Sequence, residues 1–257
     1  MPVWTVANQK GGVGKTTTAV TLAGWLALKG QRVLMLDLDP HASLTEYLDL
    51  VKAPSAGVAA LFGTPPPPLA ELICPTAVKG LDCIPASAAL ATLERQSIGR
   101  EGWGRAIDRA LKTVTGYDVA ILDCPPTLGL LMVNALAACD QLIVPTQTEF
   151  LALRGLDGML RTAGMVGLSR GAPIPTLVLA TLFDRRTRAG TQSLHELMAR
   201  QDAEVWDEPM PIDTQFRDAA AAHLPLPQLN PEARGAIAYR RLIERRLWRT
   251  EVERAAA

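Results

Sequence analysis

The chain has 257 residues, of which 48% are hydrophobic, and its 26 basic and 26 acidic side chains give a formal net charge of zero. This hydrophobic content excludes an intrinsically disordered chain, and the charge balance excludes a uniformly basic nucleic-acid binder. The length is enough for one large core, so we expect a single domain over residues 1–257.

Cysteine usage and hydropathy indicate a cytoplasmic protein. No C-x-x-C pair occurs among the four cysteines, which are Cys74, Cys83, Cys124 and Cys139. Such a pattern, without a preceding signal peptide, indicates buried thiols in a reducing compartment. No apolar run reaches the length of a transmembrane helix, so we expect no membrane insertion.

Continuous apolar runs alternate with helix-length segments along most of the chain. The runs are predicted as strands over 3–8, 32–39, 81–86, 118–124, 141–146 and 175–183. Amphipathic helices are predicted over 15–29, 100–114, 128–138 and 149–166, with one long helix over 231–253. Continuous rather than alternating apolar runs are typical of strands buried on both faces. The sequence therefore predicts an α/β fold with a mostly parallel sheet and helices on both faces.

A glycine-rich loop, NQKGGVGKTT, separates the first strand from the first helix. It departs from the phosphate-loop pattern G-x-x-x-x-G-K-[ST], because Gln9 stands at the first glycine and Lys10 adds a second lysine. A strand, a glycine loop and a helix in this order still predict phosphate binding by backbone N–H groups and the helix N-terminus. The predicted nucleotide-binding residues are Lys10, Gly11, Gly12, Val13, Gly14, Lys15, Thr16 and Thr17.

Within this loop we expect Lys15 to reach the β- and γ-phosphates and the Thr16 hydroxyl to bind Mg²⁺. Two later strands end in carboxylates, Asp37 and Asp39 in RVLMLDLDPH and Asp123 in DVAILD. The carboxyl ends of parallel strands meet at one edge of a sheet, where ligands of such folds bind. We therefore expect these acids to support the magnesium-phosphate centre or its chemistry.

The motifs KGGVGKTT, VLMLDLDPH and VAILDCPP, in this order, resemble those of the deviant Walker-A ATPases, the ParA and MinD group. The likeness continues through TLFDRRT, MPIDTQFRDA and ARGAIAY, which are similar to C-terminal blocks of ParA, so it covers nearly the whole chain. The resemblance implies a single-domain P-loop NTPase that uses ATP and Mg²⁺ and forms an ATP-dependent homodimer. It also implies that Lys10 reaches across that dimer to the partner's phosphates, as an arginine finger does.

The resemblance assigns further roles. Asp39 matches the residue that orients or activates the attacking water, and Asp37 and Asp123 match the acidic pair that supports Mg²⁺ through its water shell. Pro211 and Asp213 align with the segment that contacts adenine, although many relatives have Asn at the second position. His41 stands where Gln is usual, which we interpret as a surface variation.

Short ParA proteins lack an N-terminal helix-turn-helix and contact DNA through arginines of the ATP-bound dimer. The same is expected here, since the first strand begins at residue 3. Arg186 matches one such arginine and is flanked by Arg185 and Arg188. A second family arginine falls on Gln215, and Arg217 follows two residues later. The final helix adds Arg240, Arg241, Arg245, Arg246 and Arg249.

MinD-like membrane anchoring needs a terminal helix with a large apolar face. The apolar residues of the last helix fit a stripe that packs on the core, and the tail TEVERAAA is acidic. We therefore expect no membrane binding. The packing stripe comprises Ile237, Leu242, Ile243, Leu247 and Trp248.

The resemblance implies an ATPase that positions a cargo on the nucleoid and is stimulated by a cargo-side activating protein. DLDPHASLT and ALATLERQS look most like a branch associated with chemotaxis genes, which positions chemoreceptor arrays, and chromosome or plasmid partitioning is the alternative. A non-enzymatic DNA-binding regulator is an alternative of another class. Metabolic use of the fold, as in dethiobiotin synthetase or the nitrogenase iron protein, is a further one. For the iron protein, Cys124 would have to hold a cluster, and the Pro125-Pro126 that follows it is instead partition-like.

Overall fold

The six predicted strands all form and lie in one sheet. A computed structural model describes residues 1–96 and 103–247 of the chain. The six strands are β1 (Val3–Val6), β2 (Val33–Asp37), β4 (Leu81–Ile84), β5 (Val119–Asp123), β6 (Gln141–Gln147) and β7 (Thr176–Thr181). Each is almost entirely buried, as continuous apolar runs require.

Two further strands complete an eight-stranded sheet in the order β3-β4-β2-β5-β1-β6-β7-β8. All neighbours pair in parallel except β3 (Cys74–Pro75), which is antiparallel to β4 at one edge. The other edge strand is β8 (Glu204–Val205). Both edge strands have two residues, too few to give a hydropathy signal, and the sequence analysis missed them.

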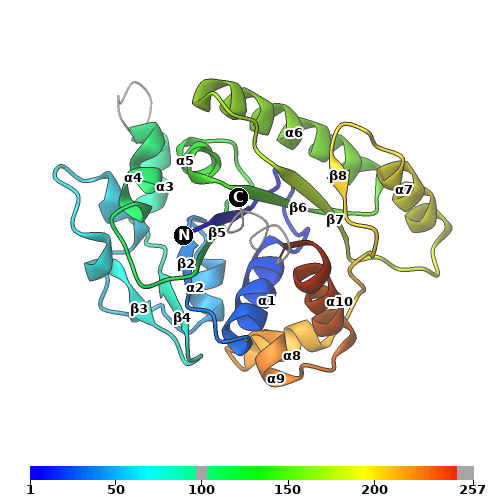
Figure 1. Ribbon diagram of the computed structural model, residues 1–257, viewed down its shortest axis with the longest axis horizontal. Coiled ribbons are helices and arrows are strands. Elements are labelled where there is room, and N and C mark those ends of the chain that lie inside the picture. The colour runs from blue at the N-terminus through cyan, green and yellow to red at the C-terminus, as the bar shows by residue number, and fades with distance from the viewer. Residues whose placement is uncertain (97–102, 248–257) are drawn as a thin grey trace.

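Helices cover both faces of the sheet, as Figure 1 shows. One face carries α1 (Lys15–Leu28), α2 (Ser43–Tyr47), α8 (Gln215–Ala221), α9 (Leu226–Leu229) and α10 (Arg234–Leu242). The other carries α3 (Ala89–Gln96), α4 (Ala106–Leu111), α5 (Leu130–Ala138), α6 (Phe150–Arg170) and α7 (Arg188–Met198). Shorter helical turns are Val58–Phe62, Leu69–Leu72, Trp103–Arg105 and the π-turn Ile243–Leu247. The predicted single α/β architecture is confirmed.

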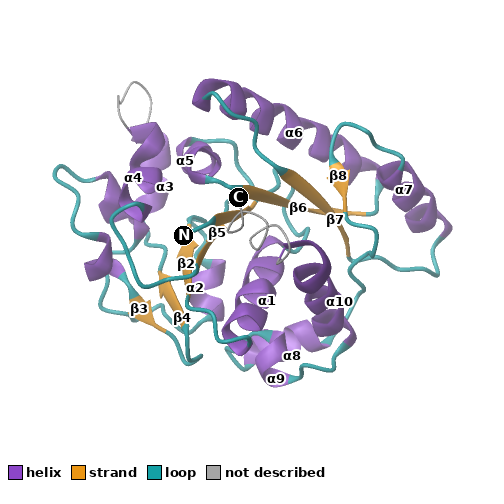
Figure 2. Cartoon of the chain, viewed as in Figure 1, coloured by secondary structure: helices purple, strands orange, loops and turns teal. Residues whose placement is uncertain are grey.

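Alternation along the strands divides the core into two layers. On β2, Leu34 and Leu36 belong to the core layer that includes residues of α5 and α6, whereas Val33 and Met35 belong to the layer that includes residues of α1 and α10. Successive strand side chains point to opposite faces, so each strand contributes to both layers. The helices in Figure 2 accordingly lie on the two sides of the strands.

The predicted helices form with changed bounds. The described part of the segment 100–114, residues 103–114, contains the short α4, preceded by one 3₁₀ turn. α1 was predicted to be amphipathic and is instead buried on most sides, because α9 and α10 cover the face that turns away from the sheet. The long C-terminal helix becomes α10 and a π-turn that ends at Leu247, while Trp248, Arg249 and the tail beyond them lie outside the described residues.

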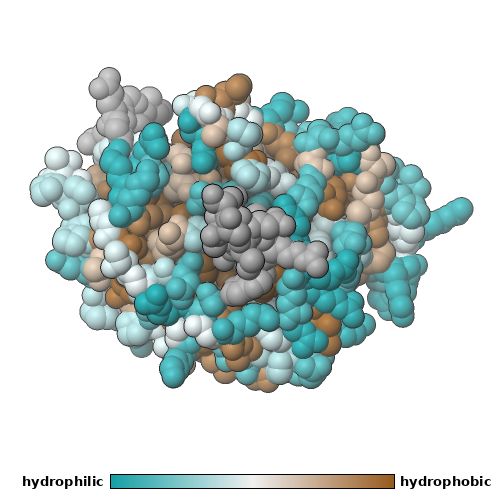
Figure 3. Space-filling view, in the orientation of Figure 1, coloured by the Kyte–Doolittle hydropathy of each residue, from teal (hydrophilic) through white to brown (hydrophobic). Residues whose placement is uncertain are grey.

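The four cysteines are buried and form no disulfide bonds, as predicted. Within residues 1–96 and 103–247, no helix combines the length and apolar character needed to cross a bilayer. The surface in Figure 3 is mostly hydrophilic, with apolar residues scattered between polar ones.

Candidate active site

The glycine loop joins β1 to α1 and is shaped to receive an anion. Gly12 and Gly14 have φ angles of +74° and +88°, in the left-handed region that favours glycine. A Cβ placed on either glycine would meet no atom within 4 Å, so the loop faces open space. The N-terminus of α1 has neither a side-chain cap nor an acidic residue in its first turn. Its backbone N–H groups and partial positive charge are therefore available to a phosphate.

Residues outside the glycines hold the loop. Asn8 donates through Nδ2 to the Pro145 carbonyl at 2.8 Å and accepts the Lys10 backbone N–H at 3.0 Å. Thr181, at the end of β7, donates to the Val13 carbonyl at 2.8 Å. These contacts tie the loop to the ends of β6 and β7.

Gln9 explains the departure from the glycine of the standard pattern. Its side-chain amide donates to the Thr162 hydroxyl of α6 at 3.1 Å. A Cβ on Gly158 would lie 2.9 Å from the Gln9 side-chain oxygen, so α6 has a glycine where the glutamine packs. Gln9, at the position of the first glycine of the standard pattern, therefore attaches the loop to α6.

Lys15 lies at the start of α1 and is only 8% exposed. Its Nζ donates to the Lys10 carbonyl at 3.2 Å. Burial lowers the pKa of Lys15, and the carboxylates of Asp123 and Asp39 oppose that shift. A buried cation so close to the glycine loop is placed to bind phosphate oxygens.

Asp123 ends β5 beside the first turn of α1. One of its carboxylate oxygens accepts the Thr16 hydroxyl at 2.7 Å. The other is buried and has no hydrogen-bond partner among the described residues. Burial, and then the nearby Asp37, raise the pKa of Asp123 to about 8. This carboxylate needs a cation or water to complete its coordination.

Asp37 is paired in register with Asp123 on the neighbouring strand. It accepts the backbone N–H of Asp39 at 3.1 Å and both the backbone N–H and hydroxyl of Thr45, at 2.8 and 2.7 Å. Burial raises the pKa of Asp37 to about 6, although these hydrogen bonds oppose the shift. Asp37 thus also anchors the start of α2.

The Thr16 hydroxyl and the unpaired Asp123 oxygen fit a magnesium ion that keeps several waters. Within the described residues, no three His, Cys, Asp or Glu side chains form a metal cage. Mg²⁺ commonly binds with one or two protein oxygens, waters and substrate phosphates, so a cage is not required.

Asp39 follows β2 at the same edge of the sheet and is 9% exposed. Its Oδ1 accepts the backbone N–H of His41 at 2.9 Å and lies 2.8 Å from the His41 ring nitrogen Nδ1. The sequence analysis treated His41 as a surface variation. The ring is largely exposed, yet it contacts the residue predicted to handle the attacking water.

The side chain of Lys10 has different partners from that of Lys15. Its Nζ lies 2.9 Å from the side-chain oxygen of Gln147 and 3.1 Å from a carboxylate oxygen of Glu149. The side-chain amide of Gln147 also donates to the Gly12 carbonyl at 3.2 Å. The sequence analysis missed Gln147 and Glu149. Their position at the carboxyl end of the predicted strand 141–146 indicates a place near the ligand, because ligand-binding residues gather at that edge of a parallel sheet.

Pro211 lines a cavity of about 610 Å³ with Phe183, Asp184, Arg186 and Arg234. The structure does not bring the Asp213 side chain to this cavity. Its two carboxylate oxygens accept the backbone N–H groups of Gln215, at 3.0 Å, and Gly235, at 2.9 Å. Asp213 therefore joins the starts of α8 and α10, and its carboxylate suits two N–H donors.

The arginines predicted to bind DNA are exposed. Arg186 forms a bidentate ion pair with Asp184, at 2.7 Å for the closest contact, and this pairing lowers the pKa of Asp184 to about 2. Among the described residues no ion pair within 4 Å forms at Arg185, Arg188 or Arg217.

The arginines of the last helix are largely neutralised, unlike Arg185 and Arg188. Within the described part of the helix, their partners are acids of segment 204–208 and Glu232. The pairs are Arg240 with Glu232, Arg241 with Glu208, Arg245 with Asp207 and Glu208, and Arg246 with Glu204. This helix adds less basic surface than its sequence indicates.

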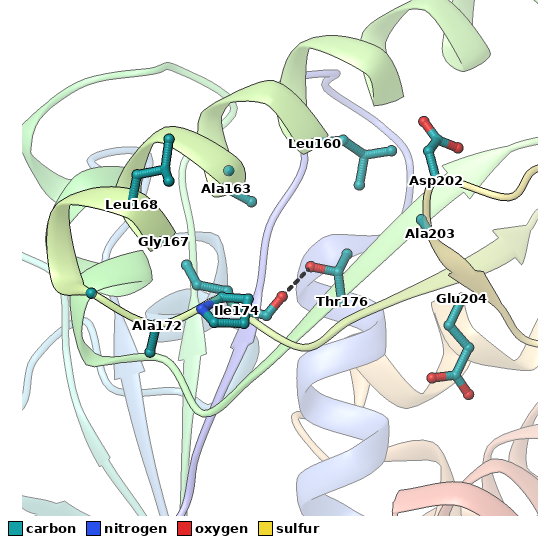
Figure 4. A pocket seen from close by; sticks show the side chains of 13 residues that line it. Leu160, Ala163, Gly167, Leu168, Ala172, Ile174, Thr176, Asp202, Ala203 and Glu204 are labelled. Carbon is teal, nitrogen blue, oxygen red and sulfur yellow. Dashed lines mark hydrogen bonds between the residues drawn. The ribbon is translucent and has the colours of Figure 1, made fainter.

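A cavity of about 800 Å³ lies away from the glycine loop, between the C-terminal half of α6, the start of β7 and segment 202–204 (Figure 4). Its wall is mostly aliphatic, from residues such as Leu160 and Ile174. Its acids, Asp202 and Glu204, are paired with Arg200 and Arg246. No group in this wall matches the chemistry assembled at the glycine loop.

Comparisons with known proteins agree with this geometry. A family model described as an AAA domain matches residues 1–170. The sporulation initiation inhibitor protein Soj of Bacillus subtilis is 36% identical over 91% of this chain and 93% of its own length. The chromosome-partitioning ATPase Soj of Thermus thermophilus is 39% identical over 93% of this chain and 92% of its own. A structure of cobyrinic acid a,c-diamide synthase from Mycobacterium smegmatis, with a bound ATP analogue and magnesium, is 34% identical. It superposes with a TM-score of 0.82 over 98% of this chain and 97% of that one.

Proposed function

The chain belongs to the ParA-type P-loop ATPases of the AAA domain family, in the partitioning branch, and from that premise we propose that it is a positioning ATPase that works as an ATP-dependent sandwich dimer on non-specific DNA. It hydrolyses ATP with Mg²⁺. In this cycle the monomer is the resting state, the ATP-bound dimer binds DNA, and ATP hydrolysis releases the protein from DNA.

The observation that supports the dimer is that the two lysines of the loop have different partners. Lys15 is buried against its own loop, whereas Lys10 lies on Gln147 and Glu149, with 28% of its side chain exposed. A part-exposed cation that pairs with the end of β6 rather than with its own loop supports a role at the phosphates of a second copy. Such a cation stabilises transition-state charge only when the two subunits close.

For the chemistry, we assign each residue of the site one task. The glycine loop and Lys15 hold the phosphates, and Asp39 orients the attacking water. Thr16 and Asp123 hold Mg²⁺, which neutralises phosphate charge when it is bound with ATP. Asp37 supports Asp123 through its place on the adjacent strand and fixes the start of α2.

Hydrolysis is a better assignment than synthesis of a second product. The cleft beside Asp39 has a volume of about 290 Å³, which admits water or a side chain. Small-molecule sites commonly span about 300–1,000 Å³. A cleft at the lower end of this range favours water over a large acceptor such as cobyrinic acid.

For DNA, the turn 185–188 and Arg217 on α8 provide exposed arginines for contact with phosphates. Pairing two subunits would double the number of phosphates neutralised, so we assign DNA binding to the ATP dimer and localisation to the nucleoid. Pro211 and its cavity are assigned to the adenine. A cargo-side protein is proposed to stimulate turnover.

The experiment for the core of this proposal compares Asp39→Ala with the wild type by light scattering and phosphate release. We expect Asp39→Ala to remain a dimer with ATP and to release phosphate at least tenfold more slowly. A monomer with normal turnover would refute the assignment.

We propose chemoreceptor arrays as the cargo, with chromosome or plasmid partitioning as the alternative. Imaging of labelled arrays and replication origins in a deletion strain separates the two. Dispersed arrays with normal origins would support the first, and misplaced origins the second. A protein that binds DNA but releases no phosphate with DNA and partner present would be a non-enzymatic regulator.

A further inference from the structure

The turn after β2 places both the backbone and the ring of His41 on one oxygen of Asp39. The backbone N–H and Nδ1 of His41 lie 2.9 and 2.8 Å from Asp39 Oδ1. The turn is closed by the Ala42 N–H, which donates to the Asp39 carbonyl at 2.8 Å. Ala42 itself has a φ of +57°, which costs about 1–2 kcal/mol for a residue with a Cβ. The local backbone is thus strained in the conformation that brings His41 to Asp39.

The 2.8 Å contact identifies Nδ1 as the donor. An ionised carboxylate can only accept hydrogen bonds, so Nδ1 carries the hydrogen and Nε2 lies on the opposite side of the ring. The His41 side chain is 79% exposed, against 12% for that of Asp39. Protons can therefore exchange between solvent and the histidine while the carboxylate remains shielded.

Among the described residues, the charged groups around this pair are Lys15, Asp37, Asp123, Glu94 and Arg95. The cleft of about 290 Å³ beside it is lined by Asp39 and His41, by Pro125 after β5, and by Glu94 and Arg95 of α3. Glu94 also accepts the backbone N–H groups of Leu130 and Leu131 at the start of α5, at 3.2 and 2.9 Å. On the inner side, Asp39 faces the Lys15 cation. The histidine therefore lies on the solvent side of the predicted water-orienting carboxylate.

We propose that His41 is a positioning residue that holds Asp39 for the attacking water and makes the hydrolysis step depend on pH. This inference rests on the role proposed above for Asp39. Neutral His41 donates one ordinary hydrogen bond and fixes the carboxylate. Cationic His41 forms a charge-assisted bond, roughly twice as strong, that draws charge from the carboxylate and makes it a weaker acceptor for the attacking water. Histidine is the side chain whose charge ordinarily changes between about pH 5 and 8.

The test is single-turnover ATP hydrolysis from about pH 5.5 to 8.5, the range in which histidine titrates, at constant ionic strength and with saturating Mg²⁺ and non-specific DNA. In the wild type we expect the rate to rise roughly tenfold across this range. His41→Gln keeps a side-chain donor that cannot become charged, so its rate should be independent of pH and near the wild-type maximum. His41→Ala leaves only the backbone N–H, and its rate at pH 8 should fall about tenfold, less than the roughly 100-fold that a 1 Å misplacement can cost, because the backbone contact remains.

Matched controls use the two other histidines of the chain, His195 and His223. His195→Gln and His223→Gln should keep the wild-type pH profile. Binding of a fluorescent ATP analogue should change less than twofold in every histidine variant, because the contact acts on water rather than on phosphate.

The outcomes separate the inference from the function beneath it. Asp39→Ala should lose the single turnover. If it does not, the role of Asp39 fails, and this inference fails with it. If Asp39→Ala is inactive while His41→Gln keeps the wild-type pH profile, or His41→Ala keeps the wild-type rate, only the inference about His41 is overturned.

Discussion

Thr16 and Asp123 are joined by a hydrogen bond of 2.7 Å between the threonine hydroxyl and one carboxylate oxygen, across 107 positions of sequence. The second oxygen of Asp123 is buried without a partner among the described residues. The first turn of α1 and the end of β5 therefore form one half of a coordination site. Without its cation, this half-site lowers the stability of the folded protein, because a buried carboxylate oxygen lacks a partner in the described part of the chain.

Asp123→Asn should remove most of this destabilisation, because the amide carries no charge. The folded-state pKa of Asp123 is about 8 and that of Asp37 about 6, both above the ordinary value of 3.8. The folded protein thus holds protons that the unfolded chain releases. The resulting stability is fully present below about pH 4 and is lost as the pH rises to about 8. Each pKa unit corresponds to about 1.4 kcal/mol.

Thermal unfolding without Mg²⁺ or nucleotide, at pH 5 to 8, measures this effect. The wild-type Tm should fall as the pH rises. The Tm of Asp123→Asn should fall less and exceed that of the wild type at pH 8 by several degrees, at roughly 2–4 °C per kcal/mol. Asp118→Asn is the control, because the pKa of Asp118 is lowered by its exposed Arg32 partner. Parallel curves for the wild type and Asp123→Asn would contradict the prediction.

Lys15→Ala should weaken ATP binding by roughly 10–100-fold, since a hydrogen bond to a charged group contributes about 1.5–3 kcal/mol. The cation is buried at the loop, and no other described lysine takes its place there. Titration of a fluorescent ATP analogue into the monomer gives the dissociation constant. Lys10→Ala is the matched control and should bind the analogue within about threefold of wild type, because Lys10 lies on Glu149. Equal losses in the two variants would mean that both lysines serve the same phosphates.

Much of this site follows from the sequence, for a physical reason. β1, β2 and β5 are continuous apolar runs, and parallel strands end at one edge, so Asp37, Asp123 and the glycine loop had to meet. Contacts between distant polar side chains have no such signal. The positions of Lys10 on Glu149 and of Gln9 on α6 depend on how α6 packs against the loop.

Two further features were outside the reach of sequence patterns. α7 and α8 have no predicted counterpart, because the arginines of their segment are its main sequence signal. Tertiary packing determines where these two helices begin and end. The neutralisation of the last helix depends on acids of segment 204–208, which lie more than thirty residues before the arginines they pair with. Arginine content alone gave no information about these partners.

Glu149→Gln should favour the ATP dimer. The ion pair between Lys10 and Glu149 is 3.1 Å long and partly exposed, so it stabilises the resting position of Lys10 by at most about 1 kcal/mol. Releasing Lys10 should lower the dimer dissociation constant by up to roughly fivefold, as measured by sedimentation with ATP. Lys10→Ala should lose the dimer. A weaker dimer in Glu149→Gln would show that Glu149 guides Lys10 rather than holding it back.

The DNA prediction concerns the ion pair between Arg186 and Asp184. Arg186 is 83% exposed, and both oxygens of Asp184 accept its guanidinium N–H groups, so this arginine must leave its partner to bind a phosphate. Arg186→Glu should abolish binding of the ATP dimer to non-specific duplex DNA, because it reverses the charge beside Arg185. Asp184→Asn should strengthen binding, since it removes the competing carboxylate while keeping an amide of similar size.

A surface-binding titration with ATP, with ADP and across a salt series measures both effects. The wild type with ATP should bind with a log–log salt slope of about −0.9 for each phosphate neutralised, and Arg186→Glu should show no binding at any salt concentration. Arg217→Glu should weaken binding because Arg217 is exposed on α8 without an ion pair among the described residues. Arg241→Ala is the control, since Arg241 is paired with Glu208 and should contribute little. Light scattering must show that every variant still dimerises with ATP. Equal binding with ATP and ADP, or Asp184→Asn binding no better than wild type, would separate this turn from the DNA surface and leave the dimer to reach its cargo through protein contacts alone.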